Sequence, residues 1–137
     1  MRLTNPLVFA AAGAALLTAC STAPAQQSRS PQESRELADA LAGRVAGPPQ
    51  RCITTYRTTS VRPIDAWTIL YDQGSTIYVQ NPRGGCPGVG RGNEVLVTRQ
   101  TSTQICDGDI AQTVDLTSRV QGAGCVFGPF VPYTRPR

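Results

Sequence analysis

Four widely spaced cysteines constrain the fold of this chain more than any other feature. They are Cys52, Cys86, Cys106 and Cys125. An even number of cysteines in a small exported domain predicts disulfide bonds, here two. A zinc site with four cysteine ligands is the alternative, but structural zinc ligands usually come in close pairs, and the smallest separation here is 19 residues.

Four cysteines allow three pairings, and the sequence alone does not decide between them. We favour Cys52 with Cys125, which would join the first strand to the last, and Cys86 with Cys106. Each closed loop is worth roughly 3–4 kcal/mol in the chain-entropy model, so we expect the fold to depend on oxidation.

The first 20 residues have the pattern of an export signal. Arg2 supplies a positive charge, and residues 7–17 form an apolar run that is too short to span a bilayer. The run ends in Leu17-Thr18-Ala19-Cys20, which resembles the bacterial lipobox. The resemblance implies that residues 1–19 are removed and that Cys20 is lipidated, and two or more acyl chains anchor a protein firmly. Ser21 favours the outer membrane, because enterobacterial sorting uses Asp at this position for inner-membrane retention.

Residues 20–50 are expected to connect the lipid to the folded domain. Residues 21–31 are small and polar, with two prolines, as is typical of a flexible tether. Ser30, with Glu33 three residues later, predicts a short helix with a capping box. A helix of about twelve residues is marginal alone, so it either docks weakly or frays. We place the start of the disulfide-bonded domain at residue 51. The alternatives for the N-terminal segment are a plain signal peptide that leaves a free thiol and a buried helix.

Beyond residue 50 the helical spacing gives way to short β-rich runs separated by turn residues. Six such runs predict an all-β domain, either a small antiparallel barrel or a sandwich. The best hairpin joins residues 67–71 to 76–80, while Val95 and Val97 share one face of a later strand. The six runs are residues 52–56, 67–71, 76–80, 94–99, 110–116 and a bent last strand over 126–131.

The charged residues limit the chemistry available to the chain. All 13 basic residues are Arg, the net charge is +4, and His is absent. The lack of His removes the commonest general base and every His-ligated metal site. We expect no enzyme activity, no metal and no cofactor. Ordinary solubility is the simpler explanation of the positive charge; lipid phosphates, lipopolysaccharide and peptidoglycan carboxylates are the alternative, as anionic neighbours.

The glycine-rich stretch over residues 84–92 is flanked by Arg83 and Arg91. Forked guanidinium donors on either side of such a loop could hold an anion or a partner. No helix or Lys-Ser/Thr follows the stretch, so a phosphate-binding loop is not indicated, and a simple solvent loop is the alternative.

Two other groups of side chains have structural explanations. Asp107 and Asp109 flank a glycine and are best read as turn residues, although acid–base work or calcium binding is the alternative. Most aromatic residues are expected in the core, although a glycan-binding face is possible. They are Trp67, Tyr71, Tyr78, Phe127, Phe130 and Tyr133.

Four spaced elements resemble an uncharacterised family of small proteobacterial lipoproteins, known as a domain of unknown function. They are Cys52-Ile53, Cys86-Pro87-Gly88, Ile105-Cys106-Asp107-Gly108-Asp109-Ile110 and Cys125-Val126-Phe127-Gly128-Pro129-Phe130. The resemblance covers roughly residues 51–132 and departs at Val89 and in the approach to Cys86. It implies an exported, disulfide-bonded domain and supplies no catalytic residue.

We therefore expect a lipid-anchored envelope protein, held at the outer membrane and facing the periplasm, with no nucleic acid to bind. Its expected role is that of a non-enzymatic binding or accessory module for an envelope protein or glycan. The alternative is a small periplasmic inhibitor of a cell-wall hydrolase. A third hypothesis, a weak enzyme on envelope glycans, would need two facing carboxylates.

Overall fold

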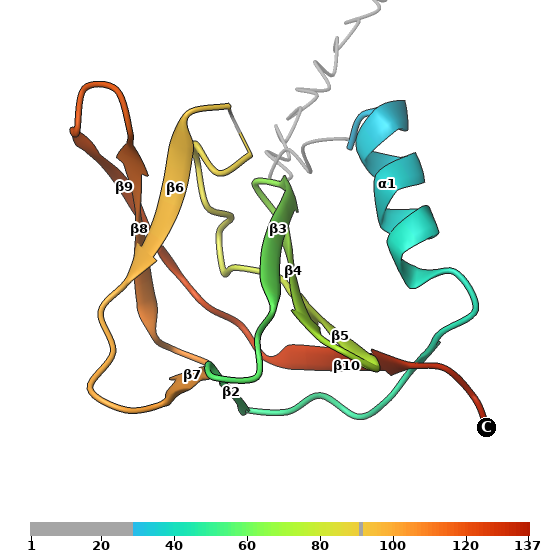
Figure 1. Cartoon of the computed structure of the whole chain (residues 1–137). Helices are drawn as coiled ribbons and strands as arrows, with labels where there is room; N and C mark the ends of the chain where they lie inside the picture. The colour runs from blue at the N-terminus through green and yellow to red at the C-terminus, as the bar shows by residue number, and fades with distance from the viewer. Residues whose placement is uncertain (1–28, 91) are drawn as a thin grey trace, which may run out of the picture.

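The computed structural model of the protein describes residues 29–90 and 92–137. These residues form one helix and ten strands in three antiparallel sheets (Figure 1). The all-β class is confirmed. The sheets form an open sandwich-like arrangement rather than a closed barrel.

The largest sheet has the strand order β1-β10-β5-β4-β3. Its centre is the hairpin predicted from the sequence, with a turn at Gly74 and Ser75 in which Gly74 has a φ of +70°. Tyr71 pairs with Tyr78 across this hairpin. The strand bounds are β1 Val45–Ala46, β3 Ser60–Asp65, β4 Thr68–Gln73, β5 Thr76–Gln80 and β10 Phe130–Thr134.

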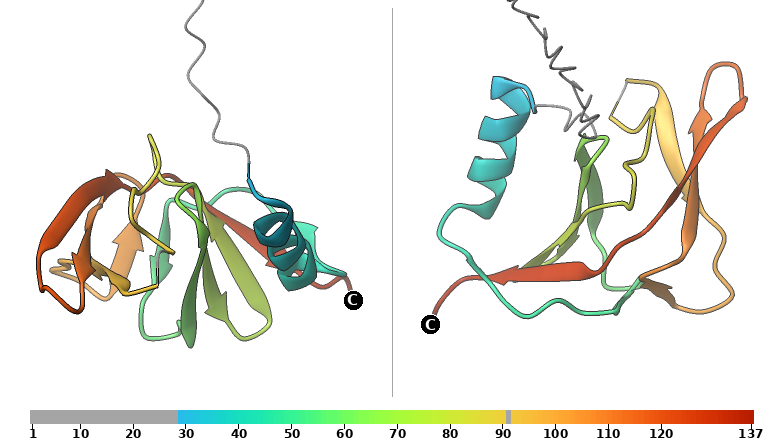
Figure 2. Two further views of the ribbon diagram at one scale, coloured as in Figure 1. Left: turned by 90° about the horizontal axis from the view of Figure 1, so that it is seen from above. Right: turned by 180° about the vertical axis from the view of Figure 1, so that it is seen from behind.

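Helix α1 (Pro31–Leu41) covers one face of this sheet (Figure 2). The predicted capping box is confirmed: the Ser30 amide donates to the Glu33 carboxylate at 2.7 Å, and the Glu33 amide donates to Ser30 Oγ at 3.2 Å. The helix docks through its apolar side rather than fraying. Its contact residues are Leu37, Ala40 and Leu41, which pack, together with Tyr133, on a cluster of Ile64, Leu70, Ile77 and Val79.

The sheet begins before residue 51, where we expected the domain to start. Val45 pairs with Thr134, and the Gly47 amide donates to the carbonyl of Pro132 at 2.8 Å. The two-residue strand β1 has too little sequence pattern to be detected, because only its pairing with β10 defines it.

A three-stranded sheet has the order β6-β8-β9, with bounds Glu94–Thr98, Ile110–Asp115 and Gln121–Val126, and a two-stranded sheet pairs β2 (Cys52–Thr54) with β7 (Gln104–Cys106). The single bent strand predicted over residues 126–131 is wrong. Val126 ends β9 and Phe130 begins β10, which belongs to the five-stranded sheet. The chain passes between the sheets at Gly128, where a Cβ atom would lie 2.6 Å from the Asn81 carbonyl oxygen.

The main core lies where the three sheets meet. Tyr71, Phe127 and Phe130 form its aromatic centre, with edge-to-face ring pairs whose centroids are 5.6–6.3 Å apart. Burial raises the pKa of Tyr71 above its ordinary value. The other members of this core are Ile53, Ile69, Cys86, Val89, Ile105, Ala111 and Cys125.

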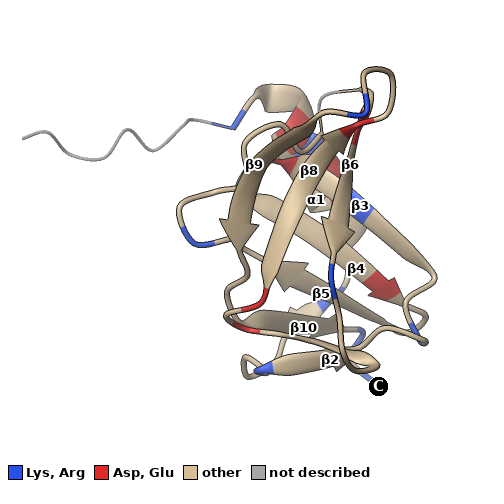
Figure 3. Cartoon of the chain, turned by 90° about the vertical axis from the view of Figure 1, so that its left-hand side faces the viewer, with Lys and Arg blue, Asp and Glu red and all other residues tan. Residues whose placement is uncertain are grey.

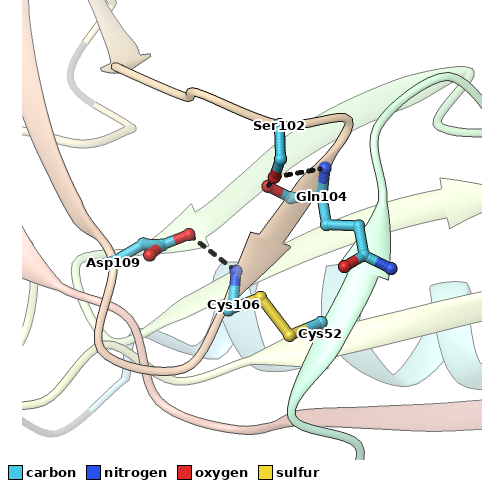
Figure 4. Close-up of a disulfide and its surroundings, with 5 residues drawn as sticks. All are labelled: Cys52, Ser102, Gln104, Cys106 and Asp109. Atoms are coloured by element: carbon cyan, nitrogen blue, oxygen red, sulfur yellow. Dashed lines mark hydrogen bonds between the residues drawn. A yellow bond between two sulfur atoms is a disulfide. The ribbon is translucent and has the colours of Figure 1, made fainter.

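The prediction of two disulfides is confirmed, but the pairing that we favoured is wrong. Cys52 is bonded to Cys106, its direct partner across the β2–β7 pair (Figure 4). Cys86 is bonded to Cys125. Cys52, which lies in β2, is therefore not joined to Cys125. The favoured pairing assumed that the chain closes on itself through its ends, whereas β2 pairs with β7 and Cys125 faces the core beside Cys86.

Candidate functional site

The outward side of the β6-β8-β9 sheet carries an exposed group of large apolar side chains. This outer apolar face consists of Val95, Val97, Ile110 and Val126, with exposed fractions between 36% and 64%. Ile110 pairs with Val126 across the sheet, so their side chains lie on the same side. The inward side of the same strands carries Leu96, Ala111, Thr113 and Cys125.

Figure 3 looks onto this sheet from outside, and its charged residues lie at strand ends and in loops. Residues 95–98, 110–114 and 121–126 contain no Asp, Glu, Lys or Arg. Within the described part of the chain, β6 pairs only with β8, so its other edge carries no strand. Exposed apolar side chains grouped on one face of a sheet are typical of a protein or membrane contact.

A polar cavity of about 330 Å³ lies at the start of α1, between the β3–β4 turn and the glycine-rich loop. Arg29 extends along its wall, donating from Nε to the Asp65 carboxylate and from Nη2 to Thr68 Oγ1, both at 2.5 Å. Asp65 also accepts a hydrogen bond from the Trp67 amide at 2.6 Å. The Arg29 guanidinium is thus already neutralised by the domain itself.

Trp67 lies on the same wall and is 38% exposed. Its indole ring packs on Gly85, where a Cβ atom would lie 3.2 Å from three ring atoms. Gly85 also has a φ of +78°, a conformation that favours glycine. The glycine-rich loop therefore has a structural role, because Gly85 packs against the Trp67 ring.

We considered Arg83 and Arg91 as a pair that could bind an anion on this loop, and the structure describes only Arg83 of the two. Arg83 makes an ion pair with Asp107 at 2.6 Å and does not line the cavity. Arg91 and the expected lipidation site Cys20 lie outside the described residues.

The Asp107-Gly108-Asp109 segment is a turn, as predicted. Asp109 accepts a hydrogen bond from the Cys106 amide at 2.8 Å (Figure 4), and Gly108 has a φ of +94°. In the described part of the chain, no cluster of three or more His, Cys, Asp or Glu side chains is arranged to hold a metal ion. No helix in that part is long and apolar enough to cross a membrane.

Sequence reasoning missed the outer apolar face. The alternation over residues 94–99 and 110–116 located the strands, but it did not show that Val95, Val97 and Ile110 point away from the core. Among the aromatic residues, Tyr71, Phe127 and Phe130 are buried as expected, whereas Trp67 is exposed.

No curated protein and no solved structure matches the chain. One family model matches residues 3–126, which is most of the sequence. The match includes the four domain cysteines, the glycine-rich loop and the strands of the outer apolar face. The chain therefore belongs to a family of unknown function, DUF6491.

Proposed function

We propose that this protein is a lipid-anchored, non-enzymatic binding module of the cell envelope, held at the outer membrane through Cys20. The lipobox-like sequence before Cys20 supports the anchor. The two disulfides support export, because such bonds persist in oxidising compartments.

The outer apolar face carries the binding proposal. Val95, Val97, Ile110 and Val126 form an uncharged, β-branched surface beside the unpaired edge of β6. Its partner is an envelope protein that presents a flat apolar surface, with an extended segment able to pair with β6. Water contact with this surface is unfavourable, and burial against such a partner removes it.

The bonding of four aspartates supports a role without catalysis. Asp65, Asp109 and Asp115 each accept hydrogen bonds from backbone amides, and Asp107 is paired with Arg83. These groups hold turns in shape, which gives each a structural role.

Site-specific photocrosslinking in intact cells tests the binding proposal. A photoreactive residue at position 97 is expected to give one discrete adduct, and the same residue at Tyr56, which is 73% exposed in the β2–β3 connection, is expected to give none. Ile110→Asp, added to the chain that carries the probe at position 97, should abolish the adduct. The binding proposal fails if position 97 gives no adduct, or if Tyr56 gives the same one.

The mass of the first peptide of the mature chain tests the anchor. We expect an acylated Cys20, and we expect Cys20→Ser to release the protein from the membrane fraction. If the captured partner is a cell-wall hydrolase, its activity with wild-type chain and with Ile110→Asp distinguishes an inhibitor from an accessory module.

A further inference from the structure

We propose that one end of the domain docks on the surface of a phospholipid bilayer. This Arg29 end is formed by the first turn of α1, the β3–β4 turn, the start of β6 and the β8–β9 turn (Figures 1 and 2). The inference rests on the proposed lipid anchor. It adds which end faces the bilayer and which side chains enter the headgroup region.

The β8–β9 turn presents two large apolar side chains at this end. Leu116 is 61% exposed and Val120 is 63% exposed. The turn between them is held in shape by Asp115, whose carboxylate accepts hydrogen bonds from the amides of Ser118 at 2.7 Å and Thr117 at 2.8 Å. Leu116 and Val120 are therefore exposed on a turn that hydrogen bonds hold in shape.

Trp67 adds an interfacial side chain to the same end. It lies in the β3–β4 turn, is 38% exposed and is supported by Gly85. Tryptophan is enriched where protein surfaces meet the headgroup layer, because its ring is apolar and its N–H is polar.

The charges at the Arg29 end do not carry the docking. Arg119 is exposed at the tip of the β8–β9 turn, and Arg29 is paired with Asp65. Glu33, Glu94 and Asp115 lie at the same end, so its described residues have no excess of positive charge. The docking therefore rests on the apolar side chains of Leu116, Val120 and Trp67.

The length of the chain before Arg29 favours a bilayer as the occupant. Residues 21–28 separate Cys20 from Arg29, and nine steps of a fully extended chain span at most about 30 Å. A lipid on Cys20 therefore keeps Arg29 near the membrane, at the end that carries Trp67 and the β8–β9 turn. Weak interfacial contacts become effective when an anchor already holds the protein at the surface.

Fluorescence of Trp67, the only tryptophan of the chain, tests the inference directly. Purified chain of residues 20–137, with its four domain cysteines oxidised, is coupled through the Cys20 thiol to a maleimide lipid. The vesicles contain phosphatidylethanolamine and phosphatidylglycerol with brominated acyl chains. We expect a blue shift and loss of about half of the emission, since an interfacial group lies about 5–10 Å deep.

Matched variants separate docking from mere tethering. Leu116→Asp with Val120→Asp should restore the emission, whereas Ile110→Asp, equally exposed at 64% but on the outer apolar face, should leave the quenching unchanged. In a Trp67→Phe chain, a probe placed by Tyr56→Trp in the β2–β3 connection, at the opposite end in Figure 1, should remain unquenched. Circular dichroism verifies that each variant is folded.

Equal quenching at both probe positions, or none at Trp67, would overturn the docking. So would an emission shift in solution that grows with protein concentration, because that result would assign this end to a second copy of the chain. The chemical coupling supplies the anchor regardless of whether cells acylate Cys20. An unacylated Cys20 in cells would overturn the proposed function by the separate mass measurement, while the vesicle result reports on the docking alone.

Discussion

Removing the two disulfides one at a time should have unequal effects on stability, although chain entropy predicts nearly equal ones. Cys52 and Cys106 are 54 residues apart, and Cys86 and Cys125 are 39 apart. The chain-entropy model gives about 4.2 and about 3.9 kcal/mol for loops of these lengths. Burial differs more, because Cys86 and Cys125 are 0% and 3% exposed in the main core, whereas Cys52 and Cys106 are half-buried.

Cys86→Ala with Cys125→Ala therefore loses core packing as well as the cross-link. Two missing sulfur atoms in a close-packed interior cost on the order of 1–2 kcal/mol more. We expect this variant to be the less stable of the two by about 0.7–1.7 kcal/mol, since its shorter loop offsets about 0.3 kcal/mol of the packing loss, in urea unfolding followed by circular dichroism at a common slope. A loss of about 5 kcal/mol is comparable to the whole stability of a small domain, so the Cys86→Ala, Cys125→Ala variant should unfold at the lower temperature of the two.

Two results would refute this reasoning. The first is a Cys52→Ala, Cys106→Ala variant that is equally or more destabilised, since burial would then contribute nothing. The second is a Cys52–Cys125 linkage found by mass spectrometry of unreduced peptides, which would contradict the pairing itself.

Three further predictions concern single side chains. Gly128→Ala should cost about 2–3 kcal/mol in urea unfolding, because its Cβ would lie 2.6 Å from the backbone oxygen of Asn81, while Gly124→Ala, whose Cβ would meet an ordinary contact at 3.8 Å, should cost less than about 1 kcal/mol. Gln80→Met should raise the free energy of unfolding in urea by about 1–2 kcal/mol, because the buried Gln80 amide has no hydrogen-bond partner among the described residues; an unchanged or lower value would contradict this. Tyr71 is kept neutral by burial, so its contribution to stability is complete below about pH 10 and falls as the pH rises further; Tyr71→Phe should flatten that part of the curve.

The locally encoded parts of the fold were predictable from the sequence. Ser30 and Glu33 mark the start of α1 because their reciprocal hydrogen bonds need only the residues between them. The β4–β5 hairpin is equally local, with Gly74 at the one position that needs a positive φ.

The parts that depend on distant contacts were not predictable. Strand β9 contains Gly122 and Gly124 and has no alternating pattern, so only its pairing with β8 defines it. Gly122 is needed there because a Cβ atom would approach Thr113 Oγ1 to 2.3 Å. The disulfide pairing follows from the same long-range arrangement, and four cysteines carry no local record of it.

The outer apolar face shows how sulfur can determine which side of a sheet is buried. In β6 and β8 the apolar residues Val95, Val97 and Ile110 face outward, while Leu96 and Ala111 face the core, and Ala111 lies opposite Cys125. A shift of β9 by one residue would turn Cys125 away from Cys86 and break their bond. The disulfide therefore fixes the register of β9 on β8, and with it the side of the sheet that faces the core. A chain that tolerates such an exposed face in water gains stability only where a partner covers it, which is why Ile110→Asp should affect partner capture far more than folding.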